Sequence, residues 1–154
     1  MKTLIVGVGS PILGDDGVGI VIARHCKELF SSINNVDVAE IGTGGLSLLD
    51  IVAGYDRLIL LDAVISGSPP GTVQVLDESA ISDTVHLGTG HEADLKTTLA
   101  LGRKLAGQPL PKEVHIVAVE VRDVTTFSES LSPEVQAAVP SAVAAVEKLL
   151  RSSG

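Results

Sequence analysis

Apolar segments short enough to be buried strands alternate with segments of helical period along this chain. The strand-like segments cover residues 3–9, 35–41, 57–64 and 114–121, and the helical segments cover residues 16–30, 46–53, 91–106 and 132–151. Strands that alternate with helices form a mostly parallel sheet, because each helix returns the chain to the end at which the next strand begins. The order therefore predicts a three-layer α/β/α fold around a twisted sheet of about five strands.

Three segments carry finer expectations. Residues 72–76 alternate between apolar and polar side chains, which predicts a short antiparallel edge strand. Ser132 followed by proline is typical of a helix start, and Pro140 predicts a kink or an interruption further along that helix. The helix over residues 16–30 should bury one face, made of Val18, Ile22, Cys26 and Leu29.

Composition and charge exclude several classes of function. The 154 residues suit a single domain, and 45% of them are hydrophobic, which predicts a packed core. A net charge of −8 with only 2% aromatic residues argues against nucleic-acid binding. The single cysteine excludes an internal disulfide or a multi-cysteine zinc site and fits a reducing compartment. Without a targeting segment or a membrane-spanning apolar run, the sequence predicts a cytoplasmic protein.

Acidic side chains gather where the predicted strands end. In a sheet of this kind the ligand site lies beyond the carboxyl ends of the strands, near the point where the strand order reverses. The candidate residues at this edge are Asp15, Asp16, Glu40, Asp62, Glu120, Arg122 and Asp123.

Two interpretations of these acids remain open. Asp16, Asp62 and either His86 or His91 offer oxygen and imidazole donors for a divalent cation, or a general base and acid for hydrolysis. An acid facing such a cleft, Asp62 in particular, can stay hydrated. Alternatively the acids cap helices and end loops, and Asp15 and Asp16 stand where a helix dipole favours negative charge.

A pair of glycines after the first strand suggests a rival class. Gly7-Val8-Gly9 matches the start of a dinucleotide-binding fingerprint, but Ile12 occupies the place of its third glycine. Pro11 also removes an N–H group from the loop that would hold the phosphates. Glu40 is the one feature in favour of a ribose contact. The alternative function is thus a non-enzymatic nucleotide- or metal-binding α/β module.

The run from Gly7 to Gly19 (GVGSPILGDDGVG) resembles the opening motif of the [NiFe]-hydrogenase maturation endopeptidases. The resemblance continues in order through residues 41–43, 54–64, 70–73 and 91–96, and it implies one domain of this type over residues 1–154. Two positions differ from the family pattern, since Ser10 replaces a frequent asparagine and Val121 a common proline.

The resemblance implies a peptidase that removes a C-terminal extension from the hydrogenase large-subunit precursor after nickel insertion. It assigns catalysis to Asp16 and Asp62, and metal contact to Asp16, Asp62 and His91. The nickel would be recognised in the substrate rather than held tightly by the free enzyme. Either a carboxylate activates the attacking water, as in an aspartyl protease, or the metal polarises the carbonyl.

Overall fold

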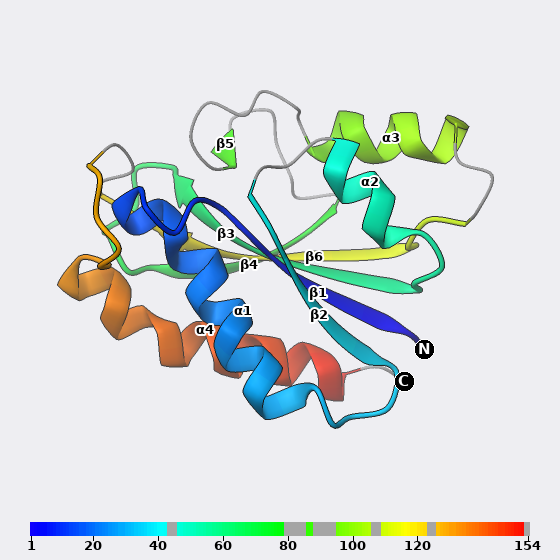
Figure 1. The fold of residues 1–154 in the computed structure, drawn as a ribbon, viewed down its shortest axis with the longest axis horizontal. Coiled ribbons are helices and arrows are strands. Elements are labelled where there is room, and N and C mark those ends of the chain that lie inside the picture. Colours follow the sequence, from blue (N-terminus) through cyan, green and yellow to red (C-terminus); the bar gives the residue numbers. More distant parts are fainter. Residues whose placement is uncertain (43–45, 79–85, 88–94, 106–108, 123–125, 153–154) are drawn as a thin grey trace.

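The computed structural model describes residues 1–42, 46–78, 86–87, 95–105, 109–122 and 126–152 (Figure 1). Its sheet has the strand order β2-β1-β3-β6-β4, and the short strand β5 pairs with the end of β3. The parallel strands are β1 (Thr3–Val8), β2 (Val36–Ile41), β3 (Arg57–Ile65) and β6 (Glu113–Glu120). The edge strand β4 (Val73–Asp77) and β5 (His86–Leu87) run antiparallel. The predicted α/β class, the mostly parallel sheet and the antiparallel edge strand are confirmed.

Helices cover both faces of this sheet (Figure 1). The 3-10 helix η1 (Gly14–Gly17) leads into α1 (Val18–Phe30), which packs with α4 (Pro133–Arg151) on one face. On the other face lie α2 (Leu46–Val52) and α3 (Leu95–Leu105). No helix in the described ranges is long and apolar enough to cross a membrane.

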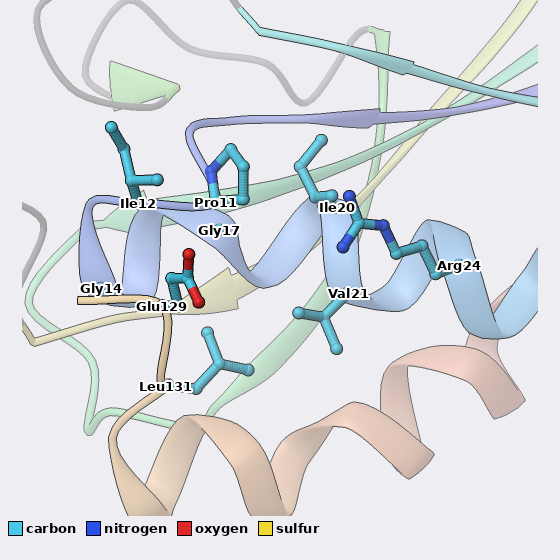
Figure 2. A pocket seen from close by; sticks show the side chains of 9 residues that line it. All are labelled: Pro11, Ile12, Gly14, Gly17, Ile20, Val21, Arg24, Glu129 and Leu131. Atoms are coloured by element: carbon cyan, nitrogen blue, oxygen red, sulfur yellow. The ribbon is translucent and has the colours of Figure 1, made fainter.

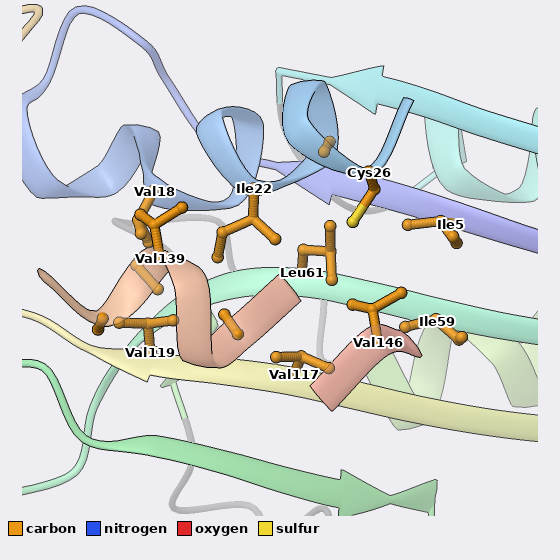
Figure 3. Packing of buried hydrophobic residues seen from close by; sticks show 14 of the residues in the cluster. Ile5, Val18, Ile22, Cys26, Ile59, Leu61, Val117, Val119, Val139 and Val146 are labelled. Carbon is orange, nitrogen blue, oxygen red and sulfur yellow. The ribbon is translucent and has the colours of Figure 1, made fainter. Parts of the chain in front are cut away.

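The central strand β3 contributes to the core on both sides. Ile59, Leu61 and Ala63 point to the layer of α1 and α4, where Leu61 lies among Ile22, Val139 and Val146 (Figure 3). Leu58 and Leu60 alternate with them and face α2 and α3. Each such fully buried side chain stabilises the fold by about 1.5–3 kcal/mol through removal from water.

Glycine lets α1 lie directly on the sheet. A Cβ added at Gly19 would overlap the carbonyl oxygens of Val8 and Leu61, so no larger residue fits between this helix and strands β1 and β3. Gly7 faces Gly19 across the same contact, where an added Cβ would overlap the Gly19 carbonyl oxygen. Gly7, the first glycine of the apparent phosphate-binding fingerprint, thus serves close packing between helix and strand.

One sequence expectation about helices is wrong, and a second is wrong in part, because only an interruption at Pro140 is contradicted and a kink there stays a prediction. Leu29 is 59% exposed, and Phe30 is buried in its place because it continues the i, i+4 row of Ile22 and Cys26. The last helix is not interrupted at Pro140, which lies on its exposed side. There the carbonyl group that loses its N–H partner to the proline ring can turn to water.

Candidate functional site

The strand order reverses between β1 and β3. From β1 the chain passes through α1 to β2 on one side, and it then returns through α2 to β3 on the other side of β1. Ligands of open α/β sheets bind at the carboxyl ends of the strands that flank such a reversal. Asp16 follows β1 in η1, and Asp62 lies in the last part of β3, so both acids occupy this position.

Asp16 is held in place by the loop before it. Its side chain is buried, with the residue 1% exposed, and its Oδ2 accepts a hydrogen bond of 2.8 Å from the Ser10 N–H group. Gly9 has a φ of +144°, and a Cβ at that position would overlap the Asp16 carbonyl oxygen. The turn at Gly9 therefore requires glycine and brings the backbone of Asp16 against the end of β1.

Asp62 occupies a core position on β3. It follows Leu58 and Leu60 in the alternation toward α2 and α3, and the residue is only 3% exposed. Its Oδ1 accepts a hydrogen bond of 2.8 Å from the Ala63 N–H group. The expectation that this carboxyl stays hydrated is wrong, because the residue is almost completely removed from solvent.

The electrostatics of Asp62 show that the two acids interact. Burial raises the pKa of the Asp62 carboxyl well above 3.8 because desolvation disfavours the charged form. The Ala63 N–H group lowers that pKa in part, and the negative charge of Asp16 raises it further. The structure thus places both acids at the reversal point, with Asp16 close enough for its charge to act on the Asp62 carboxyl.

The third predicted ligand, His91, lies outside the described residues. The strand β5, which precedes it in the chain, pairs His86 with Ile65 at the carboxyl end of β3. That is the end of β3 at which Asp62 lies. Within the described ranges no three His, Cys, Asp or Glu residues form a group that could hold a metal ion.

The other acids of this edge have structural partners. Glu120 is buried and accepts hydrogen bonds from Ser66, at 2.9 Å from N–H and 2.5 Å from the hydroxyl. Glu40 pairs with Arg24 at 3.2 Å on the surface. Asp123 lies outside the described residues.

Asp15 and Asp16 do not cap a helix. The N-cap positions of η1 and α1 are Leu13 and Gly17, and neither start has a side-chain cap. Asp15 instead accepts hydrogen bonds from Ser132 and from the Arg122 N–H group. Sequence reasoning missed Ser132 as a partner of Asp15, because a serine before a helix predicts only a cap for that helix.

A pocket of about 340 Å³ lies beside the acidic turn (Figure 2). Neither Asp16 nor Asp62 lines it, although Gly14 and Gly17, on either side of Asp15 and Asp16, do. The lining residues are Pro11, Ile12, Gly14, Gly17, Ile20, Val21, Arg24, Glu129 and Leu131. The pocket is therefore a neighbour of the carboxyl pair and not its binding cavity.

The fold and this site define a class: a small α/β protein with paired acidic side chains at the reversal point of a mostly parallel sheet. The profile of the hydrogenase maturation protease family matches residues 20–149. The Hydrogenase 2 maturation protease of Escherichia coli (strain K12) is 30% identical over 156 residues, covering 100% of this chain and 93% of the relative. The hydrogenase expression/formation protein HupD of Rhizobium leguminosarum bv. viciae is 26% identical, covering 99% and 76%.

Solved structures agree with the sequence relatives. The hydrogenase maturating endopeptidase HybD from E. coli superposes with a TM-score of 0.82 at 28% identity, covering 100% of this chain and 94% of the other. The [NiFe] hydrogenase maturation protease HybD from Thermococcus kodakarensis gives 0.80 at 26% identity, covering 97% and 99%. The chain belongs to the hydrogenase maturation protease family and is a peptidase, as the opening motif predicts.

Proposed function

We propose that this peptidase removes the C-terminal extension of a [NiFe]-hydrogenase large-subunit precursor once nickel has been inserted. Asp16, Asp62 and His91 recognise the nickel that the precursor carries, and this contact places the scissile bond. The observation that carries the proposal is the buried pair of Asp16 and Asp62 at the strand reversal. Relatives named as hydrogenase maturation proteases support the substrate class.

The electrostatics of the pair favour a cation as its partner. Two carboxyls in a buried site disfavour double ionisation, and burial together with Asp16 keeps the pKa of Asp62 raised. A divalent ion that the substrate brings close favours ionisation of both carboxyls, since a bound cation lowers the pKa of adjacent acids. Two carboxylates and one imidazole leave coordination positions free for the precursor's own ligands.

Peptide hydrolysis at this site needs a base that accepts a proton from the attacking water and an acid that protonates the leaving amine. A carboxyl whose pKa is raised, as that of Asp62 is, favours its protonated form and suits the acid role in the route without metal contact. The Asp16 carboxylate is close enough to Asp62 to affect its pKa and suits the base role. The same pair fits the aspartyl-protease route, in which the carboxyls alone activate water.

The precursor itself tests the proposal. Purified protein is incubated with nickel-loaded and nickel-free large-subunit precursor, and mass spectrometry follows the mass of the precursor's C-terminus. We expect shortening of the nickel-loaded form only, and its loss in Asp16→Asn and Asp62→Asn. Glu40→Gln is the matched control, because it removes a carboxylate from the same region that is committed to a surface pair with Arg24.

Two results would contradict parts of the proposal. Equal shortening of the nickel-free precursor would support the aspartyl-protease route and reject nickel recognition. Protection by a nucleotide without any cleavage would instead support the binding-module alternative.

We place the reaction in the cytoplasm, where the buried thiol of Cys26 stays reduced.

A further inference from the structure

Asp15, the neighbour of Asp16, binds a distant part of the chain. The residue is 1% exposed, and its Oδ1 accepts a hydrogen bond of 2.7 Å from the Ser132 N–H group. Its Oδ2 accepts hydrogen bonds from the Ser132 hydroxyl at 2.8 Å and from the Arg122 N–H group at 3.3 Å. A buried carboxylate with three donors is expensive to disturb, because removal of the acceptor leaves those donors unsatisfied.

A second set of bonds joins the same two segments. The Gly14 N–H group donates to the Ser128 carbonyl at 2.8 Å, and the Ser128 N–H group donates to the Ile12 carbonyl at 2.9 Å. These bonds form a parallel bridge between Leu13 and Ser128. The turn that carries both acids is therefore attached to the segment before α4 by backbone and by side chain.

Ser132 serves this attachment instead of its own helix. It occupies the N-cap position of α4 with φ −63° and ψ 156°, yet its side chain makes no capping bond to α4. The hydroxyl donates to Asp15 instead. The carboxylate lies at the positive end of the dipole of a 19-residue helix, which favours its negative charge.

The helix at the other end of these bonds, α4, is packed into the core. α4 packs on α1 and β6 through a buried row of Val135, Ala138, Val139, Ala142 and Val146. Asp16 has a different partner, the Ser10 N–H group, and its charge acts on Asp62. The two adjacent acids thus have different roles: Asp15 attaches the turn to α4, and Asp16 belongs to the carboxyl pair with Asp62.

We propose that Asp15 is a positioning residue of the peptidase, which sets Asp16 relative to Asp62 by fastening η1 to the N-terminus of α4. This inference rests on the proposed function of Asp16 and Asp62. Asp15 itself is buried and bonded to the start of α4, which leaves its side chain no surface for substrate contact. Its effect on the reaction passes through the geometry of the pair, where a displacement near 1 Å can cost about 100-fold in rate.

The test is the steady-state cleavage of nickel-loaded precursor by Asp15→Asn. The asparagine keeps the shape of the side chain but has one acceptor oxygen in place of two, and its NH2 group faces N–H donors. The side-chain part of the attachment is therefore weakened, while the backbone bridge between Leu13 and Ser128 remains. We expect kcat to fall about 10- to 100-fold. KM should stay within about threefold, because Asp15 is too buried for substrate contact.

Two comparisons separate positioning from a general loss of stability. Ser132→Ala removes one donor and should lower kcat several-fold, whereas Ser132→Thr keeps the hydroxyl and should restore wild-type kcat. Val146→Ala destabilises α4 at the end far from Ser132 and should leave kcat unchanged below its melting temperature.

Each outcome decides between the two proposals. Cleavage by the wild type, none by Asp16→Asn, and wild-type kcat in Asp15→Asn would overturn the positioning role and leave the proposed function intact. Full cleavage by Asp16→Asn, or none by the wild type, would overturn the proposed function and the positioning role with it. Equal loss of kcat in Ser132→Ala and Ser132→Thr would also reject the hydroxyl contact with Asp15.

Discussion

Two single substitutions on β3, Leu60→Ala and Asp62→Asn, should distinguish a side chain that stabilises the core from one that serves the site. Both side chains are buried on the α2 and α3 face of β3, two residues apart. Leu60→Ala removes apolar contacts in a central strand that has neighbours on both sides, so the surroundings cannot collapse into the space. We expect a loss of about 3 kcal/mol in unfolding free energy and a melting temperature lower by roughly 6–12 °C.

Asp62→Asn should behave in the opposite way. The amide keeps an oxygen that can accept the bond from the Ala63 N–H group, and it removes the possibility of a buried charge. The folded-state pKa of Asp62 lies well above the unfolded value of 3.8. The wild type therefore has the full stability contribution of the protonated acid below that value and loses it as pH rises through the folded-state pKa. The variant should equal or exceed the wild type near pH 8.

Chemical denaturation between pH 4 and pH 8 measures both effects, and precursor cleavage at 25 °C measures activity. Leu60→Ala should retain cleavage while folded, whereas Asp62→Asn should lose it. If Asp62→Asn were destabilised as strongly as Leu60→Ala at every pH, Asp62 would be a structural residue and its assignment to the site would be refuted. A stability difference that did not change with pH would refute the raised pKa.

Three further predictions concern packing, the thiol and the metal. In a denaturant titration, Gly19→Ala should lower the unfolding free energy by at least about 1–3 kcal/mol, because the added methyl group meets two carbonyl oxygens. Gly42→Ala is the control and should be nearly neutral, because open space surrounds that position. Cys26 should react slowly with iodoacetamide in the native protein and quickly in denaturant, as mass spectrometry would show, because burial raises its pKa to about 12. Calorimetry should show weak binding of free nickel, weaker still below about pH 6.5, where a protonated His91 cannot ligate. His91→Ala should cleave nickel-loaded and nickel-free precursor at equal rates.

The sequence by itself determined the fold class and the position of the carboxyl pair. Short continuous apolar runs and the helical period of 3.6 residues are local properties, and they mark β1, α1, β3 and β6 without any knowledge of contacts. Parallel strands place their carboxyl ends at one edge, so Asp16 after β1 and Asp62 in β3 belong to the same edge once the order is known. The resemblance of the run from Gly7 to Gly19 to a known opening motif also predicted the family.

The tertiary structure decided how deeply the acids are buried and what they bind. Asp62 appears in the sequence as an acid near a strand end, and only the folded structure shows that it is buried and that burial raises its pKa. Asp15 and Ser132 are 117 residues apart in the sequence. Local patterns predict only that each of them caps the helix that follows it. Contacts over such distances depend on how whole layers pack, which periodicity within one segment does not encode. For that reason the attachment of η1 to α4 is visible only in the folded chain.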